Sequence, residues 1–555
     1  MQTIKSCIQE ISQKFDVIDI IDCDQHSDSW VDLWIDLKKL HQEKYQANHR
    51  IIIKSTYDYY ENSNHGIILQ SLQNIINELD IPNFFICLLT TNNKIDSEYN
   101  FILTHYSYDK NPFQIYQCNG EFVRKKSSNI KPFTKIQNFD KNKLQALLDL
   151  DIDQKNMLFK NKNFCIAPWI ATMISPDSGV RPCCFYDKSI GNLKDQSMVE
   201  IWNNKNYREI RKKMIKNQEV SGCIKCRRYE NIGKESLRQS LNKEFINQIQ
   251  KVKHTQDNGE LPNVELVYVD SRFNNLCNLS CRMCSATSST SWHKSGVAMG
   301  LVDKNTPMFL SAGKRPGDLL NQIKNHVNTI EKIYFAGGEP LIIDDFYQIL
   351  EHLDKNKKYN TKLVYNTNLT KSSLKNKDIF DYWKNFKNIS IGASLDGEYK
   401  RGEYLRSGTV WNDVIEFRKK MLEIRPDIDF YVSATVSIIN CLHLADFHKS
   451  WVEQGLIKPE EFNLGLIFSP EFLRVDCAPD ILKEKIKKRY QDHLNWLRPI
   501  DKLGRATAGF ESVISHIDNS NNNFNKDNFW KNVNLFDNYY KTNLLETFPE
   551  LIDLK

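Results

Sequence analysis

The sequence of 555 residues has no long hydrophobic run and no strong excess of one charge. No stretch approaches the roughly 20 apolar residues that span a bilayer, and the polar N-terminal segment has no apolar signal core. We therefore expect a cytoplasmic protein without a membrane partner. Lys and Arg (75) exceed Asp and Glu (69) by only 6, with both signs interspersed, so a nucleic-acid-binding face is not expected either.

The sequence is not short of aromatic residues or of cysteines. Aromatic residues make up 11% of the chain, enough to build cores, which excludes disorder of the whole chain. Its 14 cysteines need an explanation other than disulfides, which are rare in a reducing compartment. Six are scattered and are interpreted as small buried hydrophobic residues. The other eight form two groups: Cys165, Cys183, Cys184, Cys223 and Cys226, then Cys277, Cys281 and Cys284.

Hydrophobic patterns after residue 263 alternate between strands and helices. Strands are predicted at residues 264–270, 333–336, 362–366, 389–394, 430–436 and 462–468. Helices are predicted between them at residues 318–330, 345–353, 373–385, 411–424 and 444–454. Six strands alternating with helices predict an α/β fold whose parallel sheet curls into a partial or complete barrel. Active-site residues are then expected just after the C-terminal ends of the strands.

The chain divides into further regions around this barrel, which we place at residues 263–490. Residues 1–150 are expected to form an N-terminal mixed α/β domain, with strands at 50–54 and 84–89 and a helix at 67–79. In this domain, the polar cluster of Asp22, Asp24 and His26 is interpreted as a solvated loop. Residues 158–240 hold the first cysteine group, and the polar stretch 241–262 is typical of a connector. Residues 491–555 form a C-terminal extension, whose aromatic end from Phe529 is expected to pack on the core as a helix.

The second cysteine group follows directly after the first predicted barrel strand, in the string Cys277-Asn-Leu-Ser-Cys281-Arg-Met-Cys284. Three thiolates in one loop can hold an iron–sulfur cluster and leave one iron open, whereas four would close it. The alternative is a zinc loop that takes His293 as its fourth ligand.

Two glycines and a carboxylate follow the second predicted strand, in the string Ala336-Gly337-Gly338-Glu339-Pro340. Paired glycines let a ligand approach the backbone closely, and a carboxylate can accept hydrogen bonds from an ammonium group. The cysteine spacing and this motif, in this order, resemble the radical S-adenosylmethionine (SAM) superfamily. In that family the residue before the last cysteine is usually aromatic, and here it is Met283. The resemblance implies that Gly337, Gly338, Glu339 and Pro340 bind the amino group of SAM.

Two later strand ends also fit this resemblance. The fourth strand ends in Gly392-Ala-Ser394-Leu-Asp396-Gly397. The resemblance implies that Ser394 contacts the ribose or carboxylate of SAM and that Arg406 binds the carboxylate. The alternative is an ordinary strand exit and a solvated arginine. Asn366 and Asn368, at the end of the third strand, face the same mouth without an assigned role.

The resemblance implies a fold and a reaction. The fold is a partial (βα)6 TIM-like radical SAM barrel, joined by a small auxiliary-cluster domain and the N-terminal mixed α/β domain. Cys277, Cys281 and Cys284 would hold a 4Fe–4S cluster, whose open iron SAM chelates through its amino and carboxylate groups. One electron from the reduced cluster would break the sulfonium C–S bond, and the 5′-deoxyadenosyl radical would abstract hydrogen from the substrate.

The first cysteine group ends in a Cys-x-x-Cys knuckle, Cys223 to Cys226, which with two separate cysteines makes four ligands. By spacing alone, zinc and an iron–sulfur cluster fit comparably well. The whole string resembles the SPASM/twitch auxiliary-cluster domains, in the form that binds a single cluster. The resemblance implies that an auxiliary 4Fe–4S cluster is held by Cys165, Cys183, Cys223 and Cys226, with Cys184 as the alternative to Cys183. In that family the auxiliary domain normally follows the barrel, and here it precedes it.

We therefore expect a radical SAM enzyme that acts on a peptide or protein. A carbohydrate, a nucleotide or another small metabolite is the alternative substrate. The expected electron donor is a flavodoxin- or ferredoxin-type protein. The competing hypothesis is a non-catalytic iron–sulfur or zinc protein that serves as a scaffold or electron carrier. No catalytic acid or base stands out, and residues 1–150 are the expected place for substrate recognition.

Overall fold

The structure is a computed structural model, which describes residues 150–231, 236–520 and 523–555 and, before them, the backbone of six strands. The chain divides into two units, Met1–Lys162 and Asn163–Lys555. In the first, β1 (Val17–Asp22) pairs in parallel with β2 (His49–Lys54). An antiparallel sheet follows: β3 (Phe85–Thr91), β4 (Tyr99–His105), β5 (Gln114–Cys118) and β6 (Phe122–Lys125).

The first unit therefore contains the strands expected at residues 50–54 and 84–89, as β2 and β3. The helix expected at residues 67–79 and the loop residues Asp24 and His26 lie outside the described residues. The unit closes with α5 (Ile152–Lys155) and a π-helical turn at Asn156–Lys160.

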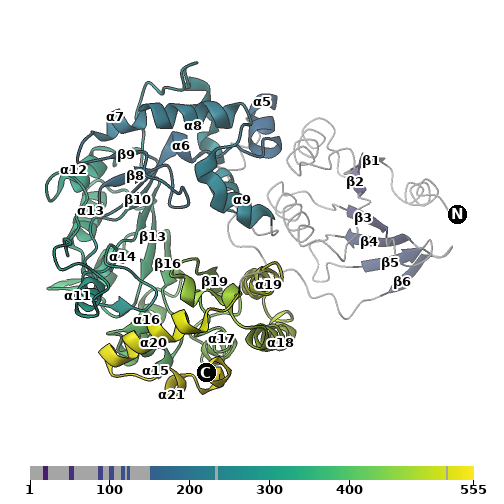
Figure 1. The fold of residues 1–555 in the computed structure, drawn as a ribbon. Helices are drawn as coiled ribbons and strands as arrows, with labels where there is room; N and C mark the ends of the chain where they lie inside the picture. Colours follow the sequence, from purple (N-terminus) through teal and green to yellow (C-terminus); the bar gives the residue numbers. More distant parts are fainter. Residues whose placement is uncertain are drawn as a thin grey trace. The chain divides into compact units, whose positions relative to one another are not determined.

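The second unit is built on a nine-stranded sheet (Figure 1). Six parallel strands form the predicted barrel part: β10 (Tyr268–Ser271), β12 (Lys332–Phe335), β13 (Lys362–Thr367), β16 (Ile389–Ala393), β18 (Asp429–Val436) and β19 (Phe462–Leu466). They pair in this order, each with the next strand of the series. The prediction of a parallel α/β sheet with six strands is confirmed.

Side chains alternate between two chemically different faces of this sheet. One face carries fully buried aliphatic residues in register, such as Val269, Ile333 and Leu363, and packs against the helices. The other carries Tyr268, Asp270, Tyr334, Asn366 and Tyr431, which we call the inner face. A carbon added at Gly392 would lie 3.0 Å from the hydroxyl of Tyr431, its partner on the neighbouring strand, so side chains on this face are closely packed.

Helices connect the barrel strands (Figure 1): α11 (Thr290–Ala298), α12 (Asp318–Asn325), α13 (Asp344–Lys355), α14 (Ile379–Trp383), α16 (Trp411–Ile424) and α17 (Leu444–Glu453). The helix expected at residues 373–385 is mostly wrong. Its first part is a small hairpin of β14 (Ser373–Leu374) and β15 (Lys377–Asp378), because Lys375 takes a positive φ of 55° and turns the chain. The Asp378 side chain then accepts the backbone N–H of Phe380 and starts α14.

The segment that precedes the barrel in sequence extends the same sheet. After α6 (Ala167–Ile170), β7 (Ala171–Ile174) pairs in parallel with β10, and β8 (Gly179–Arg181) and β9 (Gly191–Asn192) continue antiparallel. Around them lie α7 (Met198–Trp202), α8 (Lys205–Ile215) and α9 (Ile224–Asn231). Backbone hydrogen bonds thus join this segment to the first barrel strand.

The connector expected at residues 241–262 is largely helical. It consists of the end of α10 (Leu237–Glu244) and a 3-10 helix at Ile246–His254. Their polar residues bond to neighbouring elements, whereas the apolar ones, including Leu241, Ile246 and Ile249, are buried. The polar segment expected to be a connector is therefore mostly an ordered helical element with one buried side.

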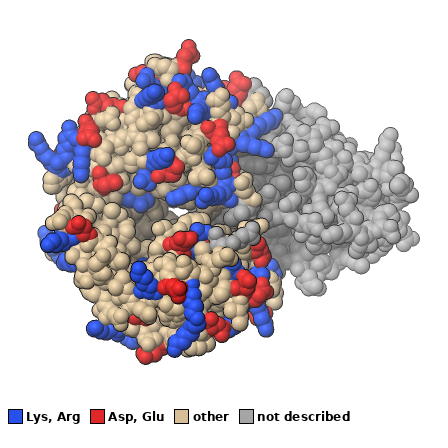
Figure 2. Space-filling model, viewed as in Figure 1, with Lys and Arg blue, Asp and Glu red and all other residues tan. Residues whose placement is uncertain are grey.

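The C-terminal part of the second unit consists of α18 (Asp480–Leu497), α19 (Arg505–Asp518), α20 (Lys526–Tyr540) and α21 (Leu544–Thr547). The expected packing of the aromatic tail on the core is found, because Phe529, Phe536 and Phe548 are buried. Figure 2 shows Lys and Arg interspersed with Asp and Glu on the visible face of this unit, which is hollowed near its centre. Among the described residues, no helix combines the length and the apolar composition that crossing a membrane requires.

Candidate active site

The three-cysteine loop leaves the C-terminal end of β10. Cys281 lies in β11 (Ser280–Cys281), which pairs antiparallel with β17 (Arg406–Ser407), so that Cys281 stands opposite Arg406. The Cys284 N–H donates to the Cys281 carbonyl at 3.0 Å, and the Leu279 N–H points to Cys277 Sγ at 3.5 Å. Backbone geometry therefore gathers all three thiols in one short loop.

Residues at the start of α11 form hydrogen bonds to the backbone of this loop. The Ser289 hydroxyl donates to the Leu279 carbonyl at 2.6 Å, and the Ser291 hydroxyl donates to the Cys277 carbonyl at 2.7 Å. The fully buried Asn275 amide donates to the carbonyls of Ala286 and Met308. The Ser/Thr-rich segment after the cysteines is thus the scaffold of the loop, which the sequence alone did not indicate.

Gly337 and Gly338 pack against the cysteine loop. Their backbone follows β12, where the Gly338 N–H donates to the Asn274 carbonyl at 3.2 Å and the Glu339 N–H to the Leu276 carbonyl at 2.8 Å. A side-chain carbon at Gly337 would lie 2.9 Å from the Asn274 carbonyl oxygen, and one at Gly338 would overlap the Leu276 carbonyl. The missing side chains thus admit the backbone of the cysteine loop, where the sequence predicted the approach of a ligand.

The Glu339 carboxylate is buried and joins two strand ends. Its Oε1 accepts from the Thr367 hydroxyl at 2.6 Å and the Leu341 N–H at 3.1 Å, and its Oε2 accepts from the Asn368 N–H at 2.8 Å. Burial raises the pKa of Glu339 to about 7, although these hydrogen bonds favour the ionised form. A carboxylate offers about four acceptor positions, so one position on Oε2 is left for a further donor.

Arg406 lies directly beside the cysteine loop. Its guanidinium is paired with Asp396 at 2.7 Å and donates to Cys281 Sγ at 3.7 Å. The hydrogen bond from Cys284 and the charge of Arg406 lower the pKa of the Cys281 thiol, against the effect of burial. Burial raises the pKa of Cys277 to about 12. The Arg406 side chain is therefore largely buried, with 12% of its surface exposed.

Of the other predicted residues at strand ends, Asn368 bonds to the cysteine loop, whereas Asn366 and Ser394 have other neighbours. Asn368 donates to the side chain of Asn278 inside the cysteine loop at 3.0 Å, and Asn278 donates to the Thr370 hydroxyl at 2.8 Å. Asn368 therefore holds the loop. Asn366 belongs to the inner face, next to Gly392. The Ser394 N–H donates to the Thr367 carbonyl at 2.8 Å, and Ser394 is half-buried at the same end of the sheet.

Helix α20, near the C-terminus, also contacts the cysteine loop. Arg282, between the cysteines, donates to Asp537 at 2.7 Å and stacks on the Tyr404 ring at 3.7 Å. The Tyr540 hydroxyl donates to the Ser280 hydroxyl. The Arg282 and Asp537 side chains are 2% and 12% exposed, so this is a nearly buried ion pair. Sequence reasoning missed this contact, because more than 250 residues separate its partners.

A polar cluster lies on the inner face near the end of β10. Arg272 binds Asp270 through Nε at 3.1 Å and Nη2 at 3.3 Å. Burial raises the pKa of Tyr334 well above its usual value, and the charges of Asp270 and Cys184 act in the same direction. The charges of Asp270 and of the Cys184 thiol thus act on the same tyrosine of the inner face. Asp270, Arg272 and Tyr334 are groups of the barrel interior that the sequence did not single out.

Four cysteines of the first group line one enclosed pocket. They are Cys165, Cys183, Cys223 and Cys226, in apolar surroundings that include Ile210, Met214 and Leu241. Burial and the neighbouring thiols raise the pKa values of Cys183 and Cys223 to about 12. Because iron or zinc binds thiolates, metal binding here must release protons.

Of the adjacent residues Cys183 and Cys184, only Cys183 lines this pocket. Burial and the charge of Asp270 raise the pKa of Cys184. We expect Cys183→Ala to lose about four irons from the reconstituted protein, since a 4Fe–4S cluster with four thiolate ligands would lose one of them. The matched variant Cys184→Ala should keep its full iron content, measured by colorimetric iron assay. Equal iron loss in both variants would contradict this assignment.

The zinc alternative at the cysteine loop takes His293 as its fourth ligand. His293 is buried in α11, and its Nε2 bonds to the Thr306 carbonyl at 2.9 Å. A zinc ion needs thiolates at about 2.3 Å from one centre. In the part of the chain that the structure describes, no three His, Cys, Asp or Glu side chains converge in a way that could hold a single metal ion.

Two family models match the two cysteine groups. The model "Iron-sulfur cluster-binding domain", SPASM, matches residues 165–227. The model "Radical SAM superfamily" matches residues 271–439. No curated protein matches the chain.

Several solved structures are similar at low identity. One, described as native anSMEcpe with bound AdoMet and Cp18Cys peptide, is 17% identical with a TM-score of 0.28, and the match covers 42% of this chain and 62% of that protein. Streptococcus suis SuiB bound to S-adenosylmethionine is also 17% identical, with a TM-score of 0.28, 59% of this chain covered and 61% of SuiB. The chain thus spans less than two thirds of the length of these proteins.

Proposed function

The chain carries a domain of the radical SAM superfamily at residues 271–439 and an iron–sulfur cluster-binding domain at residues 165–227, and from this premise we propose that it is a radical SAM enzyme. The observation that carries the proposal is the cysteine loop. Its three thiols are gathered next to Arg406, and its backbone is bonded to the Gly338–Glu339 segment.

Cys277, Cys281 and Cys284 would hold the 4Fe–4S cluster to which SAM binds. Three protein ligands leave one iron open, and the cluster and SAM, when bound, supply a 5′-deoxyadenosyl radical that abstracts hydrogen from the substrate. The free acceptor position of Glu339 Oε2 can receive the amino group of SAM. The Arg406 guanidinium pairs with Asp396 and donates to Cys281. We propose that its positive charge offsets the negative charge of the cluster loop and that it also contacts the SAM carboxylate.

The auxiliary cluster would lie at the other end of the barrel strands. Because β7 is parallel to β10, Cys165 precedes the N-terminal ends of these strands, whereas the loop of Cys277 follows their C-terminal ends. The inner face runs between the two ends. We propose that the substrate lies there, within reach of Asp270, Tyr334 and Cys184. With its four protein ligands, the auxiliary cluster serves as an electron relay or a structural support.

We propose a peptide or protein as substrate, since enzymes that the SPASM/twitch resemblance groups with this chain often modify peptides. The structure called anSMEcpe, which is similar only at low identity, also has a bound peptide. A carbohydrate, nucleotide or other small metabolite remains the alternative. A flavodoxin- or ferredoxin-type protein is the proposed electron donor, and residues 1–150 are the proposed recognition region.

Anaerobic reconstitution of the full chain tests this function. We expect about eight irons per chain, and SAM with a strong reductant should give 5′-deoxyadenosine, measured by liquid chromatography. About four irons would remove the auxiliary cluster from the proposal. About eight irons without any 5′-deoxyadenosine would instead favour the scaffold or electron carrier.

A further inference from the structure

Helix α10 belongs to neither matched domain. It begins ten residues after the end of the iron–sulfur match at residue 227 and ends well before the radical SAM match at residue 271. Its N-terminal part nevertheless lines the auxiliary pocket, because Leu237, Arg238 and Leu241 lie there beside the four cysteines. This part of the auxiliary site therefore lies outside both matched domains.

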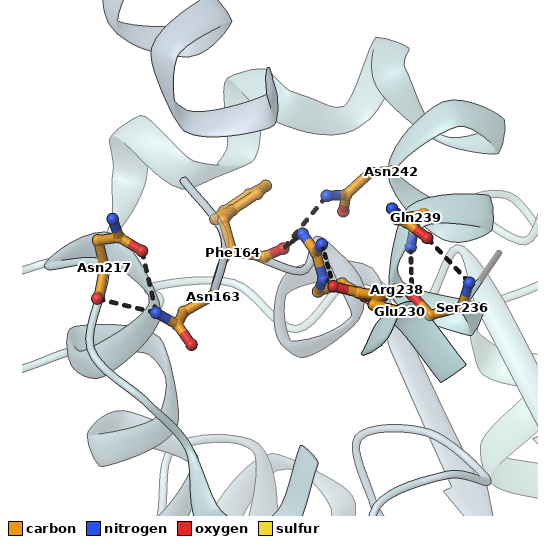
Figure 3. A network of polar contacts seen from close by, with 8 residues as sticks. All are labelled: Asn163, Phe164, Asn217, Glu230, Ser236, Arg238, Gln239 and Asn242. Atoms are coloured by element: carbon orange, nitrogen blue, oxygen red, sulfur yellow. Dashed lines mark hydrogen bonds and ion pairs between the residues drawn. The ribbon is translucent and has the colours of Figure 1, made fainter. Parts of the chain in front are cut away.

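Arg238 connects α10 to the segment that carries Cys165 (Figure 3). Its Nη1 donates to the carbonyl of Phe164, the residue before Cys165, at 3.0 Å. Its Nε and Nη2 hold the two oxygens of Glu230 at 2.9 and 2.8 Å. The Arg238 and Glu230 side chains are 13% and 20% exposed. The guanidinium is thus held by three bonds at the wall of the pocket.

A second side chain of α10, that of Asn242, also bonds to the backbone around Cys165. The buried Asn242 accepts the N–H of Ile166 at 2.8 Å and donates to the Phe164 carbonyl at 3.2 Å. Figure 3 shows both α10 side chains converging on this carbonyl. The backbone on both sides of Cys165 is therefore positioned by α10 and not only by its own domain.

The other end of α10 is anchored to the barrel. Glu244 binds Lys332 at 2.6 Å and Lys362 at 2.9 Å, and these lysines begin β12 and β13. Arg238 is a cation, because a guanidinium keeps its proton in proteins and this one is paired with the Glu230 carboxylate. One short helix thus fixes a positive charge at the auxiliary thiols and ties their pocket to the barrel.

We propose that α10 is a cap of the auxiliary site in which Arg238 positions Cys165 and raises the reduction potential of the iron–sulfur cluster bound there. The proposal rests on the proposed function, since it requires the auxiliary cluster. The physical reason is charge. A one-electron reduction adds a negative charge to the cluster, and a fixed cation in a poorly solvated pocket stabilises the reduced form.

The test uses the full chain with Cys277, Cys281 and Cys284 all replaced by alanine, so that the auxiliary cluster is the only one observed. Its midpoint potential is measured by a dithionite titration followed by electron paramagnetic resonance. In this background we expect Arg238→Gln to lower the ratio of reduced to oxidised cluster roughly tenfold at a given potential, which is about 59 mV for one electron. Glu230→Gln removes the opposing carboxylate and should shift the potential upward.

Arg228→Gln is the matched control, because Arg228 is exposed on α9 and solvent screens the same change of charge. Arg238→Lys separates the effect of charge from the positioning of Cys165. It keeps the positive charge, so the midpoint potential should change little. It loses hydrogen bonds of the guanidinium, so the cluster should lose iron to a chelator faster. Unchanged potentials in both Arg238→Gln and Glu230→Gln, at full iron content, would overturn the proposal. If Arg238→Gln does not load iron, a downward or absent shift in Glu230→Gln would overturn it. A background protein without iron would overturn the auxiliary cluster itself.

Discussion

Replacing Cys281 by alanine should abolish the formation of 5′-deoxyadenosine. Cys281 is the central thiol of the loop, it is buried, and its own strand pairing with Arg406 sets its position. Without it, only two protein ligands remain for the cluster that binds SAM. We expect about four irons to be lost and the rate to fall at least about 1,000-fold, equivalent to about 4 kcal/mol. Iron assay and liquid chromatography of the anaerobic reaction measure both effects.

Cys441→Ala provides the control for this experiment. Cys441 is also fully buried, and its thiol donates only to the Ile438 carbonyl at 3.3 Å, so its loss removes a buried group without touching the cluster loop. It should keep the iron content and the reaction. Substantial 5′-deoxyadenosine from Cys281→Ala would show that the cluster is held by other ligands.

Replacing Gly338 by alanine should unfold the cysteine loop although it removes no ligand. The added carbon would overlap the Leu276 carbonyl, which is backbone and cannot rotate away. To accommodate it, the hydrogen bonds of Gly338 and Glu339 to the loop must break or the strand end must shift. We expect a loss of about 3 kcal/mol in the free energy of unfolding and loss of the iron held by the loop. Urea unfolding of the apo protein and iron assay measure these effects.

Gly509→Ala tests whether any added methyl group is harmful. Gly509 lies inside α19, and a side-chain carbon there would make ordinary contact with Leu464 at 3.6 Å. Alanine favours a helix by about 1 kcal/mol over glycine, so this variant should be as stable as the natural chain or more stable. If Gly338→Ala were as stable as Gly509→Ala, the packing of the glycine motif against the loop would not matter for the fold.

The barrel was predictable because its signal is local. Each strand is a short apolar run and each helix has its own spacing, so that β16 and α16 appear at almost the predicted residues. The hairpin before α14 was missed because its turn depends on a positive φ at a lysine, which the sequence does not mark. The polar connector was misread because its buried side is visible only once its neighbours are in place.

Some predicted site residues make contacts that the sequence did not indicate. The glycine pair was expected to admit a ligand, and in the structure it packs against the backbone of Asn274 and Leu276. Arg406 was expected to bind SAM, and in the structure it pairs with Asp396 and donates to Cys281. Asp270, Asp537 and Arg238 were not singled out at all, because nothing in their immediate neighbours in sequence distinguishes them from solvated charges.

The sequence by itself determined the parallel α/β sheet and the two groups of cysteines, because strand periodicity and thiol spacing are properties of short segments. Only the tertiary structure decided what surrounds them. It joined β7 to β10, set α20 against the cysteine loop and set α10 against the auxiliary pocket. These contacts join residues far apart in the chain, and they form because buried charges and backbone groups must find partners wherever the folded chain brings them.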